Sequence, residues 1–233
     1  MNHNEIDPND YKNRCIKYPR EHYLHEHWYP IFENAVKKYC KKGKILDLGC
    51  GFGSSTEIVR IFNQNTIGID IAYNWLKYSK KSNPDYEIIL ADCQKIPLKD
   101  ESIDTIVSWG LFEFIDRRIT IKEIFRILKD QGICIILVPN KHSAYRYIPK
   151  TISKIFGKKY EKYEPSKKEM ILHLIGNGFD LIEFYMNDGL IWLPDQIDKI
   201  VGEKLYLITE QVIKIKSENP LSNDMLLVAM KVK

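Results

Sequence analysis

From residue 44 onward, short β-branched runs alternate with longer helical patterns. Runs of this kind are typical of strands buried in a sheet, and each connection up to residue 133 has room for one helix. The alternation predicts βαβ units with right-handed crossovers, and so a doubly wound, mostly parallel sheet with helices on both faces. We expect seven strands, at residues 44–48, 66–70, 86–91, 103–109, 133–138, 181–186 and 225–232.

Helix-terminal residues support this division of the chain. Ser54 with Glu57, and Ser166 with Glu169, have the S-x-x-E spacing of a capping box, in which each side chain satisfies a backbone N–H group. Gly132 follows a helical pattern, where a left-handed residue often ends a helix. These residues predict helix starts near 54 and 166 and a helix end near 132.

Two helical segments are expected before the first strand. In residues 30–40, Ile31, Val36 and Tyr39 share one helical face, and Pro30 suits the first turn because no helical partner is lost there. Residues 18–29 are interpreted as a separate short helix. We therefore expect a helical cap over residues 1–43 and one α/β domain over residues 44–233.

Composition narrows the class of protein. The chain has 233 residues and is 44% hydrophobic, with 35 basic and 31 acidic side chains, so the net charge of +4 does not by itself indicate nucleic acid binding. The longest apolar run, 133–138, is far shorter than the roughly 20 residues of a membrane-spanning helix. The five cysteines are scattered and form no C-x-x-C pair, which argues against a disulfide framework or a zinc ribbon. We expect a soluble, cytoplasmic protein.

The strongest chemical signal is the run K-I-L-D-L-G-C-G-F-G-S-S at residues 44–55, a buried strand that enters a glycine-rich turn and then a helix. Glycines at 49, 51 and 53 remove the Cβ atoms that would obstruct close approach of a ligand to the backbone. The following helix offers free N–H groups to an anion such as a carboxylate. This run predicts a ligand-binding loop.

Two further acids end the next two predicted strands. Asp70 stands where doubly wound folds place an acid that accepts hydrogen bonds from ribose hydroxyls. Asp92 follows the third strand and has the position to accept from an adenine amino group, although aspartate is also common in turns after strands. Loop capping is the alternative role for Asp47 and Asp70. Together the three strand ends predict a nucleoside site.

With these residues in place, the sequence resembles the class I S-adenosylmethionine (SAM)-dependent methyltransferases, especially the small-molecule branch that includes quinone-biosynthesis enzymes. The resemblance rests on D-L-G-C-G-F-G at 47–53, G-I-D at 68–70, A-D-C and I-P-L within 91–98, I-D-T-I-V-S-W at 103–109 and F-R-I-L-K-D-Q-G at 125–132. It covers about residues 44–140, with a weaker continuation at 166–180. It implies a Rossmann-like sheet of seven strands whose last strand is antiparallel between the fifth and sixth.

The resemblance also implies SAM as cofactor, S-adenosylhomocysteine as product, and a role for each matched residue. The methionine end of SAM would lie against Asp47 and the glycine loop, the ribose against Asp70, and the adenine against Ile71 and Asp92. The implied cofactor-binding residues are Asp47, Gly49, Cys50, Gly51, Gly53, Asp70, Ile71, Asp92, Cys93, Trp109 and Gly110, the last two beside the sulfonium.

The methyl acceptor is expected to be a small molecule, with O-, N- and C-methylation all open. Methyl transfer is an in-line displacement on an activated methyl, so alignment matters more than any one side chain. Quinone-type relatives often have Glu-His where this chain has Glu113-Phe114, so that histidine is not the base here. The candidate bases are His22, His25, Glu113, His142 and Tyr145. No metal site is expected, since no H-E-x-x-H occurs, and the sequence does not indicate an oligomeric state.

Residues 141–168 carry nine Lys or Arg against two acids. Apolar residues at helical spacing opposite Lys150, Lys154 and Lys158 predict a basic amphipathic helix in a lid inserted after the fifth strand. We favour a solvated lid; contact with an anionic acceptor, a membrane surface or nucleic acid is the alternative.

Two other functions are compatible with parts of this pattern. An NAD-dependent dehydrogenase also has a G-x-G turn and a strand-end acid, but Ser54 occupies the position of its third glycine and Asp92 would have no role. A non-catalytic SAM-binding protein stays open, because the fold does not fix the function.

Overall fold

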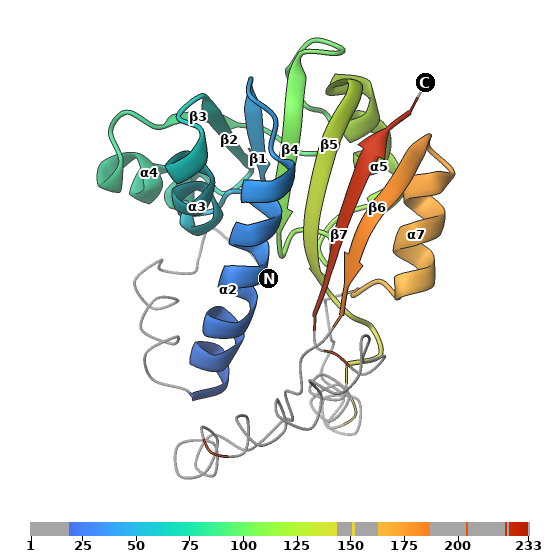
Figure 1. Cartoon of the computed structure of the whole chain (residues 1–233). Helices are drawn as coiled ribbons and strands as arrows, with labels where there is room; N and C mark the ends of the chain where they lie inside the picture. The colour runs from blue at the N-terminus through green and yellow to red at the C-terminus, as the bar shows by residue number, and fades with distance from the viewer. Residues whose placement is uncertain are drawn as a thin grey trace.

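The computed structural model describes residues 19–143, 151, 163–186, 204, 222 and 224–232, with side chains from residue 26 onward. In these residues, seven strands form one sheet with the order β3-β2-β1-β4-β5-β7-β6 (Figure 1). The strands are β1 (Ile45–Leu48), β2 (Thr66–Asp70), β3 (Glu87–Leu90), β4 (Ile103–Trp109), β5 (Leu128–Pro139), β6 (Phe179–Tyr185) and β7 (Asp224–Lys231).

The first five strands run parallel, and β7 lies antiparallel between β5 and β6. This confirms the seven-stranded, doubly wound sheet with an antiparallel last strand. Because the strand order reverses between β1 and β4, their carboxyl ends flank the position where ligands bind in open α/β sheets. The edge formed by the ends of β1, β2, β3 and β4 is therefore the candidate site.

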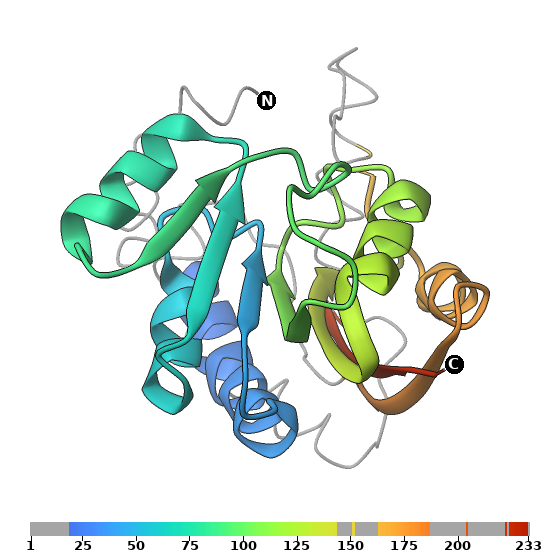
Figure 2. The same ribbon diagram turned by 90° about the horizontal axis from the view of Figure 1, so that it is seen from above.

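Helices cover both faces of this sheet, as predicted. In Figures 1 and 2, α2 (Pro19–Tyr39) and α3 (Ser54–Phe62) lie on one face, α5 (Arg117–Ile127) and α7 (Lys167–Ile175) lie on the other, and α4 (Tyr73–Ser82) lies beside the edge strand β3. Each face has its own buried cluster of apolar side chains. At about 1.5 to 3 kcal/mol for each large apolar side chain, this burial holds the helices on the sheet.

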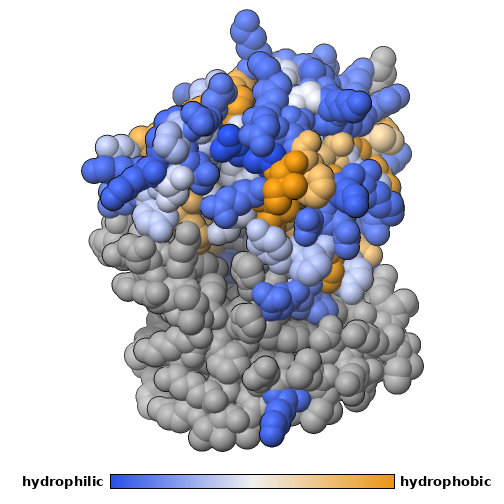
Figure 3. Space-filling view, turned by 60° about the vertical axis from the view of Figure 1, so that its left-hand side comes forward, coloured by the Kyte–Doolittle hydropathy of each residue, from blue (hydrophilic) through white to orange (hydrophobic). Residues whose placement is uncertain are grey.

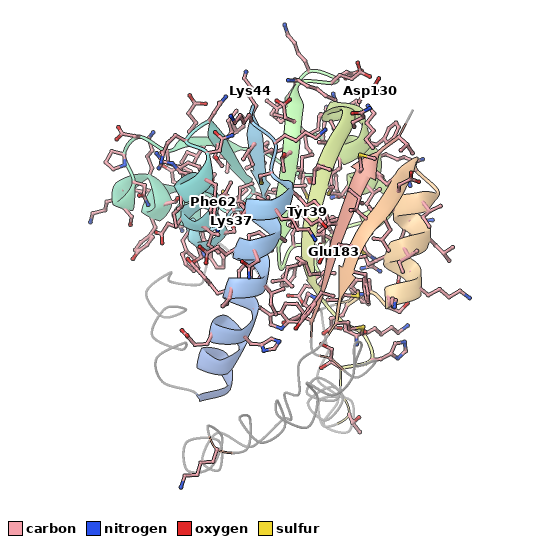
Figure 4. The ribbon with its side chains drawn as sticks, in the orientation of Figure 1. Lys37, Tyr39, Lys44, Phe62, Asp130 and Glu183 are labelled. Atoms are coloured by element: carbon pink, nitrogen blue, oxygen red, sulfur yellow. The ribbon has the colours of Figure 1, made fainter. Side chains whose placement is uncertain are left out.

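The helix α2 is longer than expected and runs through Pro30, so the prediction of two separate helices was wrong. Trp28 and Phe32, on either side of the proline, are 1% and 0% exposed and belong to the same core cluster. Their burial outweighs the roughly 3 kcal/mol that an internal proline costs a helix. Near the end of α2, Tyr39 lies on the same side of the molecule as Glu183 of β6 (Figure 4), and the Lys38 amine is 3.0 Å from the Glu183 carboxylate.

The prediction of a capping box at Ser54 was also wrong. The N-cap of α3 is Gly53, whose φ of 100° is left-handed and which makes no side-chain cap, while Ser54 is exposed in the first turn. The second predicted cap is present in part, because the Ser166 hydroxyl accepts from the backbone N–H of Glu169 at 3.2 Å. The Glu169 carboxylate instead pairs with Arg117 of α5 at 2.6 Å.

The strand β5 begins at Leu128, five residues before the predicted start, so α5 leads directly into it. Leu128 pairs with Ile103, and the register then shifts before Ile133 pairs with Thr105. Gly132 lies inside this strand, so its predicted role as a helix end was wrong. A Cβ on Gly132 would lie 2.8 Å from the Lys129 carbonyl, which is why glycine is needed there.

Parts of the predicted lid and cap lie outside the described residues. These parts include residues 144–150 and 152–162, with Lys150, Lys154 and Lys158, and residues 1–18. Of the helices in the part of the chain that is described, none is long and apolar enough to cross a membrane.

Candidate functional site

The loop between β1 and α3 is held in a conformation that only glycine adopts readily. Gly49, Gly51 and Gly53 have φ angles of 76°, 53° and 100°. A Cβ on Gly51 would lie 2.8 Å from the ring of Trp75, and one on Gly49 would lie 3.0 Å from Leu111. The glycines therefore serve both the turn and the close packing around it.

Asp47, in the centre of β1, is fully buried beneath this loop. One carboxylate oxygen, Oδ2, accepts from the hydroxyls of Ser55 (2.8 Å) and Thr56. The other, Oδ1, is buried and has no hydrogen-bond partner among the described residues. Burial raises the pKa of Asp47 to about 6. Since unpartnered buried polar atoms are rare, Oδ1 marks a place for a donor, and a cationic donor would best offset the lost hydration.

A chain of hydroxyls behind Asp47 was not foreseen from the sequence. The Tyr86 hydroxyl lies 2.6 Å from that of Thr56, and Tyr86 is 1% exposed. An ionised carboxylate only accepts, so Thr56 donates to Asp47 and Tyr86 donates to Thr56. Burial raises the pKa of Tyr86 well above its usual value, so the phenol keeps its proton.

The Asp70 carboxylate, at the end of β2, binds the glycine loop. Its Oδ2 accepts from the Gly51 N–H at 2.8 Å, and its Oδ1 accepts from the Ala72 N–H at 2.8 Å. Each oxygen keeps a further lone pair for another donor. Beside it, the apolar side chain of Ile71 is 62% exposed, so an uncovered apolar surface adjoins this acid at the sheet edge.

Asp92 lies at the same edge, beyond the end of β3, and is exposed. Its Oδ1 accepts from the backbone N–H of Gln94 at 2.8 Å, so it caps its own turn, the alternative role that the sequence left open. The neighbouring Cys93 is buried, and its sulfur lies 3.9 Å from the Thr120 hydroxyl.

Arg126 of α5 fixes the loop that follows Asp92, which the sequence analysis missed. Its guanidinium donates to the carbonyls of Ile96 (2.9 Å) and Leu98 (2.8 Å) and pairs with Glu123 at 2.8 Å. The Glu123 carboxylate in turn accepts from the Ile96 N–H at 2.9 Å. Arg126 lies within the family-like run at 125–132, but nothing in that run identifies its partners.

Trp109 is the last residue of β4, and Gly110 follows it at the same edge. The Trp109 ring packs against Phe32 and Tyr29 of α2, with ring centroids 5.1 and 6.1 Å apart. Gly110 has a φ of 71°, and a Cβ placed on it would have no atom within 4 Å. Open space therefore lies directly beside Gly110, at the end of β4.

The candidate bases differ in their surroundings. Glu113 follows β4 and is 5% exposed, and its backbone carbonyl accepts from the Tyr163 N–H at 3.0 Å. His142 is exposed, and its backbone N–H donates to Asn140 at 3.1 Å. The side chains of His22 and His25, and the whole of Tyr145, lie outside the described residues. Of the two candidate bases whose side chains are described, Glu113 is the buried one, and it lies just after the end of β4.

Comparison with known proteins gives a consistent picture. The family described as "Methyltransferase domain" matches residues 46–136, which span β1 to β5. A ubiquinone/menaquinone biosynthesis C-methyltransferase of Campylobacter jejuni is 26% identical over 190 residues, covering 65% of this chain and 77% of that protein. A demethylmenaquinone methyltransferase of Thermotoga maritima is 28% identical over 168 residues, covering 69% of each.

A solved structure shares the fold over nearly the whole chain. It is a SAM-dependent methyltransferase from Thermotoga maritima, with a TM-score of 0.63 and 20% identity, and the match covers 97% of this chain and 95% of that one.

Proposed function

Because this chain belongs to the class I SAM-dependent methyltransferases, we propose that it methylates a ring carbon of a small aromatic acceptor of the quinol type. The observation that carries the proposal is the match to two relatives, over 65% and 69% of the chain. One is named as a C-methyltransferase of ubiquinone/menaquinone biosynthesis and the other as a demethylmenaquinone methyltransferase. The packed rings of Trp109, Phe32 and Tyr29 at the end of β4, with the open space beside the next residue, Gly110, support an apolar acceptor.

SAM fits the residues at the sheet edge, and we propose a role for each of them. The unpartnered oxygen of Asp47 would accept from the ammonium group of the cofactor. The glycine loop and the first N–H groups of α3 would bind its carboxylate. Asp70 would accept from the ribose hydroxyls, Ile71 would lie against the adenine, and Asp92 with the Cys93 N–H would bind the adenine edge.

The chemistry then rests mainly on alignment. SAM supplies a methyl group activated by its sulfonium, and in the transfer the methyl–sulfur bond breaks as the new carbon–carbon bond forms. Trp109 and Gly110 would leave room for acceptor and methyl in line while the packed aromatic rings exclude water. We propose Glu113 as the group that takes the proton lost from the acceptor ring, because its carboxylate is buried beside the end of β4.

A transfer assay tests the acceptor class. The protein is incubated with methyl-labelled SAM and reduced 1,4-naphthoquinol, whose ring carbons 2 and 3 are free. The matched control is 2,3-dimethyl-1,4-naphthoquinol, which has the same ring system and redox state but carries methyl groups on carbons 2 and 3. Label is expected in the first acceptor alone. A protein that binds S-adenosylhomocysteine but labels neither quinol, while labelling an amine or a carboxylate acceptor, would contradict the quinol proposal.

A further inference from the structure

A cavity of about 280 Å³ lies between α3 and α4. On α3, the apolar residues Ile61 and Phe62 are exposed. Figure 3, which brings the left-hand side of Figure 1 forward, shows a patch of apolar residues among hydrophilic ones on this face. Gly53 belongs to the cofactor loop, and Thr56 and Tyr86 form the hydroxyl chain behind Asp47; the other described lining residues take no part in the proposed cofactor site. The cavity is therefore a separate place in the fold, and nothing in the proposed methyl transfer uses it.

Two polar groups in its lining are buried without partners. Ser79 of α4 is 0% exposed, and its hydroxyl makes no hydrogen bond in the described structure. The Nε atom of Arg60 in α3 is likewise buried and unpartnered, and Arg60 forms no ion pair with any described residue. Its guanidinium lies 5.6 Å from the centroid of the Tyr86 ring, a cation–π contact that orients it. Buried polar groups are nearly always hydrogen-bonded, so a ligand that accepts hydrogen bonds would satisfy both of these donors.

The chemistry of these groups selects the ligand. A guanidinium only donates, and its planar fork matches the two oxygens of a carboxylate or phosphate. The Ser79 hydroxyl and the side-chain amide of Asn83, which also lines the cavity, add further donors. Glu57 is the one acid among the described lining residues, and it is exposed, so water screens its charge. The cavity thus favours an oxyanion over a cation.

We propose that this cavity binds a small metabolite through a phosphate or carboxylate group, with Arg60 and Ser79 as its principal hydrogen-bond donors. The site is independent of the acceptor that the enzyme methylates, so it stands or falls separately from the proposed function. Its volume exceeds that of a bare oxyanion, which leaves room for the rest of a small ligand.

The test uses inorganic phosphate and acetate as probes, titrated into the full chain at constant ionic strength with chloride as the balancing anion. Amide chemical shifts of Gly53, Ser79 and Asn83 are expected to change saturably with one or both probes. Saturation by phosphate alone identifies a phosphate site, and saturation by acetate as well identifies a general oxyanion site. Absence of saturable shifts with either probe overturns the proposal.

Variants of the lining residues test whether phosphate binds in this cavity. Arg60→Gln is expected to weaken phosphate binding at least tenfold, whereas Lys77→Gln removes a charge from an exposed position of α4 outside the cavity and is expected to leave it within twofold. Equal affinity in wild type and R60Q overturns the proposal. Ser79→Ala, expected to weaken binding about threefold or more, serves if R60Q does not fold. Binding must also persist under saturating S-adenosylhomocysteine, since competition would place the anion in the cofactor site.

Discussion

Asp47 is the residue that most directly links folding to cofactor binding. Its carboxylate is fully buried, and desolvation raises its pKa from 3.8 to about 6. Between these values the folded protein binds more protons than the unfolded chain, so the contribution of Asp47 to the free energy of unfolding falls as pH rises through this window. Above about pH 6 the ionised group is retained at a loss of about 3 kcal/mol. A ligand cation that pairs with this buried carboxylate would offset the penalty.

Replacing Asp47 by Asn should stabilise the protein and impair binding. At pH 8 the neutral amide avoids the charge penalty, and its own unpartnered NH₂ offsets about 1 kcal/mol, so the free energy of unfolding should rise by about 2 kcal/mol. At pH 5, where the wild-type carboxylate is mostly protonated in the folded state, the charge penalty falls to about half, so the difference between the two proteins should shrink to about 0.6 kcal/mol. Urea unfolding at pH 5 and 8 measures both values.

The same variant should bind S-adenosylhomocysteine more than tenfold more weakly at pH 8, because the charged partner of the ammonium is gone. Calorimetric titration checks this. A D47N protein that is less stable than wild type at pH 8, or that binds the ligand equally well, would show that Oδ1 has no such role.

Asp70→Ala is expected to weaken SAM binding by about 1.5 to 3 kcal/mol, roughly 10- to 150-fold. The loss has two sources, since the carboxylate would bind the ribose and also holds the Gly51 N–H of the cofactor loop. Asp85→Ala removes an exposed acid near β3 and is the matched control. Unchanged affinity in D70A, with the fold intact by circular dichroism, would remove Asp70 from the site.

Glu113→Gln separates proton transfer from binding. The amide keeps the shape of the side chain but cannot take a proton, so kcat is expected to fall about 10²- to 10⁴-fold. The dissociation constant of S-adenosylhomocysteine should change less than twofold, because Glu113 is not among the proposed cofactor residues. A parallel loss of both would indicate that Glu113 supports the loop after β4 instead.

Residue patterns predicted part of this site. Acids at the ends of consecutive parallel strands must lie along one edge, and the structure places Asp47 and Asp70 on the adjacent strands β1 and β2, with Asp47 opposite Gly68 in the pairing. Their binding roles stay a prediction. Thr56 and Tyr86 were not foreseen, because a 30-residue separation carries no local signal that their hydroxyls meet.

Arg126 is the residue that connects α5 to a neighbouring loop, and its loss should lower the free energy of unfolding. It joins α5 to the loop after Asp92 through two carbonyls and two carboxylates. Arg126→Gln should lower the free energy of unfolding by about 2 to 4 kcal/mol, because Glu123 is left without its charged partner. Chemical denaturation measures this, with Arg118→Gln, a 75% exposed side chain, as control. Equal destabilisation by both variants would contradict this role of Arg126.

Element boundaries show where local signals give way to packing. The bounds of β2 and β4 were predicted from their β-branched runs, because buried parallel strands are continuous apolar segments. The predictions of a helix boundary at Pro30 and of a capping box at Ser54 failed for the same reason. Each rests on a strong local signal that tertiary contacts override. Trp28 and Phe32 draw the helix past the proline, and the conformation of the glycine loop makes Gly53 the first cap.

For the molecule as a whole, ligand-linked stability distinguishes the proposed cofactor from the dinucleotide that a G-x-G turn also suggests. A ligand that binds only the folded state stabilises it by about 2.7 kcal/mol at a concentration of 100 Kd. For a chain of this size each kcal/mol raises Tm by about 2 to 4 °C, so S-adenosylhomocysteine should raise it by roughly 5 to 10 °C. NAD should leave it unchanged, because the exposed turn at Asp92 and the orphaned oxygen of Asp47 suit an adenosyl group carrying an amino acid. Thermal scans with each ligand decide the matter, and a rise with NAD alone would overturn the assignment of the whole sheet edge.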